Sequence, residues 1–420
     1  MTELEKSRKI IDDCDKEMAK LLNKRMTAVK AIAEYKAKNF LPVEDKKREA
    51  ELINSLTKEY KNDYFADFFK SNIKISKNYQ QKLLETSEKL WVKTEKCGYP
   101  VFIKYGAINN LSDVADLNRK VLIVTDSGVP EEYISTVKQQ IKEPYIFVLP
   151  QGEQSKSYTN YIKIAEYMIK NNFSGTDCIV ALGGGMVGDI AGFVASSFMR
   201  GIDFYNIPTT VLSQADSSIG GKTAIDHLGY KNIIGAFYPP KAVIIDESTL
   251  KTLPKRQYYN GMFEALKTGV ACSRELFELF KNGDIEKNTG KIIELSIKAK
   301  REIVEKDENE NGLRRVLNFG HTVGHAIEST EKLLHGESIA LGMTFMCSNA
   351  VKAELLPILK RMNLHIKNDF DADVLFDAII HDKKVSGDKI SVAYVEKTGT
   401  CEIKETELSE LKKLLKEKTK

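Results

Sequence analysis

Three of the six histidines lie close together in the chain, at His321, His325 and His335. Neutral imidazole is the commonest metal ligand in proteins and titrates near neutral pH, so this concentration indicates a metal site. On a helix, His321 and His325 would present their rings on one face, whereas His335 needs a turn of the chain to converge with them. The alternative is that these histidines only pack or cap helices.

A carboxylate could complete such a site. Glu264 is the best candidate, because an i to i+3 step places it and Lys267 on one helical face. Two histidines and one glutamate form an open set of Zn²⁺ ligands. From spacing alone, His321 and His325 would be the histidine pair.

A second pattern is a glycine-rich turn after the apolar run 178–182. The residues of this turn that could contact a dinucleotide are Gly183, Gly184, Gly185, Gly188 and Asp189. A helical pattern follows, so we expect strand, turn and helix, with glycines that adopt positive φ and free N–H groups that bind a pyrophosphate. Such sites also carry an acid about twenty residues further on. Asp203 lies near that place, but we prefer Asp126, which follows the strand-like run 121–124. A tight structural turn is the alternative.

These patterns belong to a series of blocks, in one order, that resembles 3-dehydroquinate synthase over roughly residues 97 to 420. The blocks are 150–156, 183–189, 198–201, 208–210, 214–223, 231–235, 318–325 and 335–337. The resemblance implies an enzyme that uses NAD⁺ and a divalent metal to cyclise the seven-carbon phosphorylated keto acid DAHP into 3-dehydroquinate, with release of phosphate. The nicotinamide would be reduced and then reoxidised, without net redox.

The resemblance also implies a ligand set for the metal. Glu264, His321 and His335 would be the ligands, with His325 beside the substrate, which replaces the histidine pair expected from spacing. Zinc is the expected ion and cobalt the alternative. The metal's task would be Lewis-acid polarisation of the hydroxyl that is oxidised.

A substrate with a carboxylate and a phosphate needs a cationic pocket. The matched positions are Lys222, Lys267, Lys300, Arg314 and Lys383, with Asn232 and Asn318 as neutral donors and Asp216 as a further catalytic residue. Arg200 would reach the site of a neighbouring subunit. Each lysine taken alone would be a solvated surface charge, because the chain has 63 Lys and Arg residues.

For NAD⁺, the resemblance nominates a set of contacts spread over the first half of this region. They are Asp126, Glu153, Lys156, Gly183, Gly184, Gly185, Gly188, Asp189, Thr209, Thr210, Lys222, Lys231 and Thr252. Gln257 departs from the pattern, since the family often has glutamate there.

The first ninety residues have a different character, with no glycine before Gly98. Apolar residues Leu4, Ile11, Met18 and Ile32 share a heptad column, which predicts one long amphipathic helix ended at residue 42 by proline. Two further helices are expected at 45–60 and 64–90. Arg25 also lies in this column, where burying an unpaired guanidinium would be energetically costly. Lys36 lies three turns further along the same face of the helix. We expect a bundle around an anion; the alternative is a coiled-coil dimer with charges that set its register.

The order and spacing of the polar residues resemble an AroQ-type chorismate mutase. The matching residues are Arg8, Arg25, Lys36, Asp45, Arg48, Glu49, Ser76 and Gln80. The rearrangement of chorismate to prephenate needs no nucleophile, so catalysis must come from holding a compact conformer and stabilising charge on the breaking ether oxygen.

The resemblance assigns a role to each of these side chains. Arg8 of a partner subunit and Arg25 would bind the carboxylates, supported by Ser76 and Arg48. Lys36 and Gln80 would donate to the ether oxygen, while Asp45 and Glu49 would orient the ring hydroxyl. A homodimer is therefore expected.

Composition agrees with a multidomain enzyme acting on small molecules. At 420 residues, 42% of them hydrophobic, the chain can form two or three domains. A net charge of +4 gives no indication of nucleic-acid binding, and no apolar run is long enough for a membrane span. The charged N-terminus is no signal peptide, and six cysteines without C-x-x-C spacing fit reduced thiols in a cytoplasm.

The apolar runs predict the fold. Strands expected at 121–125, 145–149, 178–182, 204–207 and 242–245 alternate with helices, which is typical of a mainly parallel sheet. After Pro254 the patterns are helical, with a hairpin at 390–394 and 400–403. We expect an all-α chorismate mutase-like domain (1–90), an α/β Rossmann-like NAD-binding domain (97–254) and a mainly α-helical metal- and substrate-binding domain (255–420). The first join is expected between Glu85 and Lys96.

The sequence is therefore interpreted as a bifunctional enzyme of the shikimate pathway. In a second hypothesis the helical domain is a regulatory module that binds chorismate or prephenate without turning it over. A third keeps the fold but changes the reaction, to a related sugar-phosphate cyclase or a metal-dependent polyol dehydrogenase.

Overall fold

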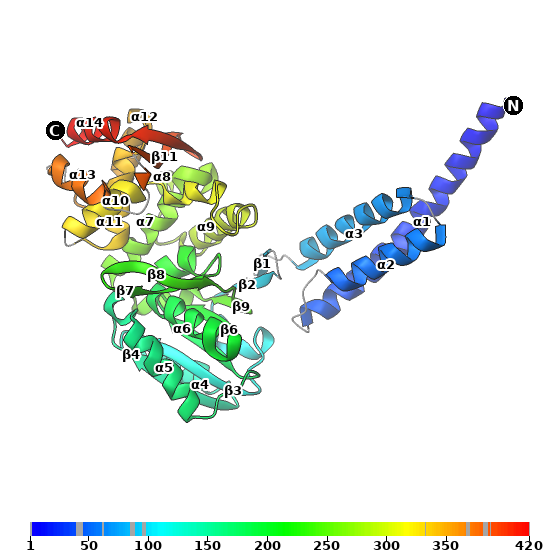
Figure 1. Ribbon diagram of the computed structural model, residues 1–420, viewed down its shortest axis with the longest axis horizontal. Coiled ribbons are helices and arrows are strands. Elements are labelled where there is room, and N and C mark those ends of the chain that lie inside the picture. Colours follow the sequence, from blue (N-terminus) through cyan, green and yellow to red (C-terminus); the bar gives the residue numbers. More distant parts are fainter. Residues whose placement is uncertain are drawn as a thin grey trace. The chain divides into compact units, whose positions relative to one another are not determined.

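The computed structural model describes residues 2–38, 45–60, 63–84, 89–94, 98–331, 333–366, 370–380, 385–386 and 388–419. The chain divides into two compact units, Met1–Pro100 and Val101–Lys420 (Figure 1). Among the described helices, none combines the length and the apolar character needed to cross a membrane.

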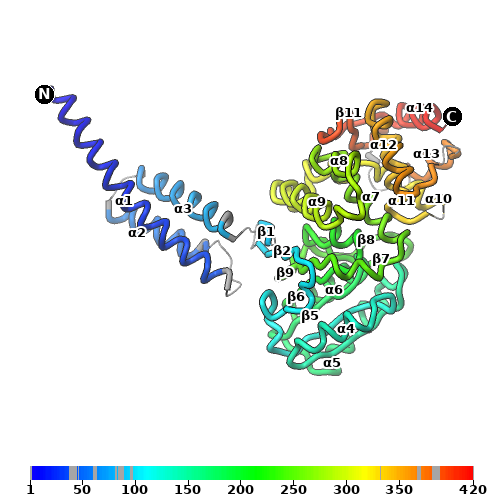
Figure 2. Tube along the Cα trace, turned by 180° about the vertical axis from the view of Figure 1, so that it is seen from behind, coloured from blue at the N-terminus to red at the C-terminus, as the bar shows by residue number. Residues whose placement is uncertain are grey.

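The described residues of the first unit form the helices α1 (Glu3–Lys38), α2 (Lys46–Tyr60) and α3 (Asp63–Leu84). Helix α3 packs against both α1 and α2, and its contact with α1 buries Val29, Ala33 and Ile73. The first half of α1 extends beyond the other two helices, as Figure 2 shows. The helical N-terminal region expected from the apolar pattern is confirmed.

The apolar column of α1 is not buried within this unit. Leu4 is 60% exposed, Ile11 58%, Met18 47% and Ile32 39%. The face of α1 that packs inside the unit is instead built from small and β-branched residues of its second half, such as Val29 and Ala33. A row of exposed large apolar side chains is typical of a contact surface.

The third helix is shorter than the predicted 64–90. Helix α3 ends at Leu84, and Lys89–Val92 form strand β1. Leu90, Trp91 and Val92 are all buried. Aromatic and β-branched residues favour a strand over a helix, so the stretch expected as a charged join contains a buried strand.

A seven-stranded sheet forms the core of the α/β region, with strand order β1-β2-β9-β6-β5-β3-β4. The strands after β1 are β2 (Tyr99–Ile103), β3 (Lys120–Asp126), β4 (Glu143–Leu149), β5 (Cys178–Gly183), β6 (Asp203–Pro208) and β9 (Ala242–Ile245). All the pairs from β2 to β4 in this order are parallel. The five strands expected from the apolar runs are confirmed, whereas β1 and β2 were not predicted.

Helices cover both faces of the sheet. On one face, α4 (Glu131–Lys138) packs on a core that includes Ile123 and Val180; on the other, α5 (Tyr158–Lys170) and α6 (Gly185–Ser197) pack on one that includes Leu122. The strand order reverses between β3 and β5. In parallel sheets, ligands bind beside such a switch point at the carboxyl ends of the strands, where Asp126 and Gly183 lie.

A two-stranded antiparallel hairpin, β7 (Lys222–His227) and β8 (Tyr230–Phe237), follows a π-helical turn, η5 (Ser213–Ser217). β7 packs against α6. Gly235 permits the close approach of the two strands, because a Cβ there would lie 2.3 Å from the backbone oxygen of Thr223. The hairpin was not predicted from the sequence.

The rest of the chain is largely helical, as predicted (Figure 1). Its helices are α7 (Lys255–Cys272), α8 (Arg274–Asn282), α9 (Thr289–Val304), α10 (His321–Thr330), α11 (His335–Phe345), α12 (Asn349–Arg361), α13 (Ala372–Ile380) and α14 (Leu408–Lys418). The expected hairpin is present as β11 (Lys389–Lys397) and β12 (Thr400–Glu407), with the short β10 (Val385–Ser386) beside it. Helix α7 is buried from Asn260 to Ala271 and packs against α8, α9 and α11.

Candidate active sites

Two packed helices bring the three histidines together. His321 begins α10 with His325 one turn on, and His335 begins α11. One ligand atom from each ring lies within 4.8 Å of the others. Glycines allow the helices to approach, because a Cβ on Gly342 would lie 2.2 Å from the backbone oxygen of Gly320. The packing of α10 against α11 thus brings His335 to the pair.

Helix α7 fixes the first turn of α11. The Asn260 Oδ1 accepts a hydrogen bond from the Gly336 N–H at 2.7 Å. Arg256 donates two hydrogen bonds of 2.8 Å to the carboxylate of Glu337, which also accepts one from the Leu334 N–H. Arg256, Asn260 and Glu264 are spaced four residues apart on α7 and therefore share one face. The contacts that hold the start of α11 also bring His335 beside Glu264.

Glu264 is 1% exposed and its two oxygens have different surroundings. The Oε2 accepts a hydrogen bond from Lys267 Nζ at 2.6 Å. The Oε1 lies 3.6 Å from His335 Nε2 and has no hydrogen-bond partner within the described parts of the chain. A buried carboxylate oxygen without a donor is costly. The arrangement therefore fits a cation held between this oxygen and the imidazoles.

Hydrogen bonds on the other ring nitrogens orient two of the histidines. His335 Nδ1 lies 2.9 Å from Glu328 Oε2, and His321 Nδ1 lies 3.2 Å from the Phe319 carbonyl oxygen. Because these partners accept hydrogen bonds, Nδ1 is the protonated nitrogen of each ring, and Nε2 is the nitrogen suited to bind a metal. Burial would lower the pKa of His335, but the hydrogen bond to Glu328 and the charge of Glu264 raise it.

A group of buried charges lies around the π-helical turn. Lys300 donates to the Asp216 side chain at 2.7 Å and to its carbonyl at 2.8 Å. Burial would raise the pKa of Asp216, but the charges of Lys300 and Lys267 hold it well below its usual range. The buried Arg314 donates to the carbonyls of Glu308 and Gly220. Glycine is required at residue 220, because its φ is 102° and a Cβ would lie 2.2 Å from the guanidinium.

Lys222 and Asn318 share one carboxylate. Lys222 forms an ion pair with Glu310 Oε2, and Asn318 donates to Glu310 Oε1 at 2.9 Å. Burial would raise the pKa of Glu310, but its contacts with Lys222 lower it. These two predicted substrate contacts therefore already form an anion-binding pair.

Asp216→Asn should destabilise the folded chain by about 3–5 kcal/mol at neutral pH, because it leaves the buried Lys300 ammonium without its counter-charge. Since the folded-state pKa of Asp216 is depressed, its contribution is present above the unfolded pKa and is lost as the pH falls. Urea unfolding at pH 7 and under acidic conditions measures both effects. On the same helix as Lys300, Glu294→Gln removes only the partly exposed ion pairs with Lys291 and Lys298 and should cost below ~1 kcal/mol. Equal costs for the two variants would contradict the assignment.

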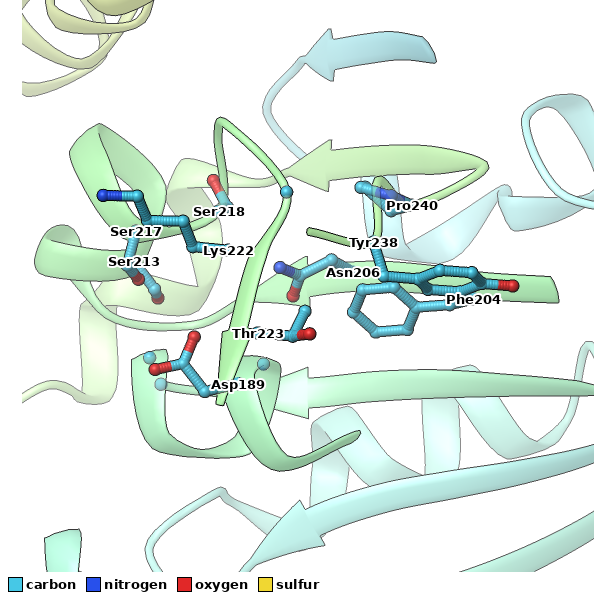
Figure 3. Close-up of a pocket in the computed structure, with 14 residues that line it drawn as sticks. Asp189, Phe204, Asn206, Ser213, Ser217, Ser218, Lys222, Thr223, Tyr238 and Pro240 are labelled. Carbon is cyan, nitrogen blue, oxygen red and sulfur yellow. The ribbon is translucent and has the colours of Figure 1, made fainter. Parts of the chain in front are cut away.

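A small pocket lies between α6 and β7, bordered by Asp189 of α6 and by Lys222 and Thr223 of β7 (Figure 3). It is lined by Gly184, Gly185, Gly188, Asp189, Phe204, Asn206, Ser213, Ser217, Ser218, Gly221, Lys222, Thr223, Tyr238 and Pro240. Lys156 donates to Asp189 at 2.6 Å. Burial would lower the pKa of Lys156, but the charges of Asp189 and Glu153 raise it.

The expectation of positive φ in the glycine turn is wrong. None of the glycines between 183 and 188 is among the positive-φ residues. They are required for close packing instead, because a Cβ on Gly183 would lie 2.6 Å from the Val187 side chain and one on Gly185 would lie 3.0 Å from Ser217 Oγ. The turn thus lets α6 start directly at the end of β5.

The remaining residues nominated for the cofactor lie mostly near the carboxyl ends of the parallel strands. Asp126 ends β3 and accepts the Gly128 N–H at 2.7 Å, whereas Asp203 lies at the opposite, amino end of β6. The Thr209 N–H donates to the Gly183 carbonyl, and Thr210 is the next residue. Thr252 Oγ1 lies 3.2 Å from the Tyr133 hydroxyl. The preference for Asp126 over Asp203 agrees with this placement.

Some predicted residues are not brought into these clusters. Arg200 is exposed, with a φ of 66°, and Asn232, with a φ of 52°, is exposed on β8. Lys231, also on β8, is by contrast connected to the histidine cluster, because it pairs with Glu328 at 2.6 Å and Glu328 contacts His335. Lys383 lies outside the described residues.

In the first unit, α1 and α3 form a polar cluster. Arg25 donates to Ser76 Oγ and to the Asn72 carbonyl. One turn beyond Ser76, Gln80 is buried, and its Oε1 has no hydrogen-bond partner in the described chain. A buried amide oxygen without a hydrogen-bond donor is typical of a site that receives a polar ligand.

Lys36 of α1 lies close to charged residues at the start of α2. Its pKa is lowered by burial, and it interacts electrostatically with Asp45, Arg48 and Glu49. Glu49 also pairs with Lys77 of α3 at 3.0 Å. Arg8 is seventeen positions before Arg25, or about 25 Å along the helix axis, and is exposed. Arg8 therefore cannot reach the Arg25 cluster of its own chain.

Sequence reasoning missed several residues that hold the histidine cluster, above all Glu328. Glu328 lies seven residues after His321 and three after His325, so the three share a helical face. This spacing could have identified it. Arg256, Asn260 and Glu337 could not have been identified from spacing, because their contacts cross between α7 and α11.

Comparisons with known proteins match both parts of the chain. Family models described as 3-dehydroquinate synthase N-terminal and C-terminal match residues 146–260 and 261–385, and one described as chorismate mutase type II matches residues 7–81. A 3-dehydroquinate synthase of Streptococcus thermophilus is 40% identical over 352 residues, covering 78% of this chain and 99% of that protein. One of Campylobacter concisus is 37% identical, covering 74% and 94%.

Solved structures agree on the fold. A 2-deoxy-scyllo-inosose synthase complexed with carbaglucose-6-phosphate, NAD⁺ and Co²⁺ has a TM-score of 0.70 at 23% identity, covering 79% of this chain and all of that one. The 2-epi-5-epi-valiolone synthase ValA of Streptomyces hygroscopicus, with NAD⁺ and Zn²⁺ bound, has a TM-score of 0.69 at 22% identity, covering 77% and 98%. With these relatives and family models, the chain belongs to the 3-dehydroquinate synthase family and carries an N-terminal chorismate mutase type II domain.

Proposed function

We propose that residues 97–420 convert DAHP to 3-dehydroquinate and phosphate, and that residues 1–90 convert chorismate to prephenate. The first activity rests on the donor-less Glu264 oxygen beside His335, in the same region as buried cations that suit a doubly anionic substrate. The second rests on the Arg25, Ser76 and Gln80 cluster.

Glu264, His321 and His335 would hold the metal, and zinc or cobalt suits this donor set. The bound ion would polarise the substrate hydroxyl. Residues 97–254 would bind NAD⁺ at the edge formed by Asp126, the glycine turn and Asp189, and the cofactor would supply reversible oxidation. The solved structures of similar fold that hold NAD⁺ with Co²⁺ or Zn²⁺ support this assignment.

The chain's cations would bind the two substrate anions. Lys300 and Arg314, both buried, suit the carboxylate. Burial would lower the pKa of Lys267, but the charge of Glu264 raises it, so Lys267 would serve as the counter-charge of the Glu264 carboxylate. A substrate anion would replace the Glu310 carboxylate as the partner of Lys222 and Asn318. His325, whose ring centroid is 5.1 Å from that of His321, would hold or move a proton beside the substrate.

In the N-terminal domain the residues need only bind the substrate and stabilise the charge that develops in the transition state. Arg25 and Ser76 would hold a carboxylate, while Lys36 and Gln80 would donate to the ether oxygen as its charge develops. The amide of Gln80 would present its NH₂ to the substrate, and Asp45 and Glu49 would orient the hydroxyl.

We further propose that the protein is a homodimer through α1. The exposed column of Leu4, Ile11 and Met18 would be covered by a second copy, which would bring its Arg8 to the Arg25 cluster. Arg8→Ala and Arg25→Ala should each abolish mutase activity, yet subunit exchange between them should restore roughly a quarter of it, because half of the dimers would carry one intact site. Measuring prephenate formation in the exchanged mixture checks this. A mixture no more active than its components would contradict donation between subunits.

The proposed function is tested by assaying the purified chain with each substrate separately, in the presence of NAD⁺ and Zn²⁺. Phosphate release without net NADH supports the synthase, and prephenate formation supports the mutase. Isothermal binding of prephenate without turnover would instead support a regulatory module. Steady accumulation of NADH would indicate a polyol dehydrogenase.

A further inference from the structure

We propose that Glu328 is a positioning residue for the metal site, which holds His335 in its ligating orientation and is itself held by Lys231 of β8. The inference rests on the proposed metal site and adds to it a residue outside the ligand set.

The position of Glu328 follows from the helix it lies on. His321, His325 and Glu328 occupy positions i, i+4 and i+7 of α10 and so project from one face. The Glu328 side chain is 17% exposed, and its two oxygens have different partners. Oε2 lies 2.9 Å from His335 Nδ1, and Oε1 lies 2.6 Å from Lys231 Nζ. The carboxylate is therefore held from both sides.

The contact with His335 has a specific chemical consequence. A carboxylate that accepts the Nδ1 proton fixes the tautomer and the ring plane, leaves the Nε2 lone pair for a metal, and makes the imidazole a better donor. The Nε2 of His335 is the atom that lies 3.6 Å from the donor-less oxygen of Glu264.

Lys231 adds a link across the second unit. It comes from the β7–β8 hairpin of the α/β region, whereas Glu328 and His335 belong to the helical region. The Lys231 side chain is 57% exposed, so its own electrostatic contribution is screened by solvent. We therefore expect Lys231 to act on the metal only through the placement of Glu328.

The test measures Zn²⁺ affinity of the full-length chain by competition with a chromophoric chelator, without any assay of turnover. Glu328→Ala should weaken Zn²⁺ binding about 10–100-fold. Glu328→Gln keeps an oxygen that can accept the Nδ1 proton but loses the charge, so its affinity should fall between those of the wild type and Glu328→Ala. Lys231→Met should weaken binding less than Glu328→Ala, and should add nothing in the double variant, because both act on one contact.

Two reference variants make the outcome decisive. Ser329→Ala changes the neighbouring exposed position of α10 and should bind Zn²⁺ like the wild type. His321→Ala removes a proposed ligand. If it too binds like the wild type, the proposed metal site fails. If His321→Ala loses Zn²⁺ while folded Glu328→Ala and Glu328→Gln bind normally, only the role of Glu328 is refuted. Additive losses in the double variant would refute the link through Lys231.

Discussion

His335→Ala should eliminate tightly bound metal and reduce phosphate release from DAHP by about 10³-fold or more, while prephenate formation stays unchanged. Lewis-acid stabilisation is worth several kcal/mol, and each 1.36 kcal/mol of lost transition-state stabilisation costs about tenfold in rate. The imidazole lies beside Glu264 in the second unit, whereas the Arg25 cluster lies in the first. Metal content and both rates, measured on one preparation, check the expectation.

The matched control is His365→Ala, which removes an exposed histidine outside the cluster. It should retain metal and both activities. Loss of prephenate formation in folded His335→Ala would contradict the independence of the two sites. Retention of metal and phosphate release would contradict the assignment of His335 as a ligand.

Lys36→Ala should reduce prephenate formation by roughly 10²–10³-fold and leave phosphate release unchanged, because removal of one donor to a developing oxyanion typically costs that much. The wild-type mutase rate should also fall at alkaline pH. Burial lowers the pKa of Lys36, and only the protonated amine donates to the ether oxygen, so activity is lost as the pH rises through a value below that of an ordinary lysine. A pH–rate profile of kcat/KM shows this limb.

Lys30→Ala provides the control, since it removes an exposed lysine from the same helix. It should leave both reactions intact. A Lys36→Ala variant with a normal mutase rate would contradict the proposed mutase site, and an alkaline limb that persists in Lys36→Ala would assign the titration to another group.

Local patterns predicted much of the fold. Parallel strands are covered on both faces, so buried strands appear in the sequence as short apolar runs. Strands β3, β5, β6 and β9 all lie at their expected positions. The end of the third helix was missed because helical periodicity cannot distinguish a last turn from a short buried strand such as Lys89–Val92. The exposed Leu4, Ile11 and Met18 show that an apolar column need not be buried within one chain.

The ligand arrangement shows where spacing stops being informative. Four-residue spacing brings His321 and His325 together, but it cannot show that Glu264 reaches His335, because that contact depends on the packing of α7 against α11. Resemblance to a family supplied this set. The glycine turn is a second example. Glycine is required there because the Val187 and Ser217 side chains lie close to the backbone, and not because φ is positive.

Glu328 is the converse case. Its spacing from His321 and His325 could be recognised in the sequence, yet a glutamate near the end of a helix is commonly a solvated charge. Only the distances to His335 and Lys231 distinguish it.

The most direct test of the account follows phosphate and NADH together while the purified, Zn²⁺-loaded chain turns over DAHP with NAD⁺. The account predicts many equivalents of phosphate for each chain and no net NADH, because the cofactor is reoxidised in every cycle. NADH that accumulates in step with substrate consumption, without phosphate, would contradict it.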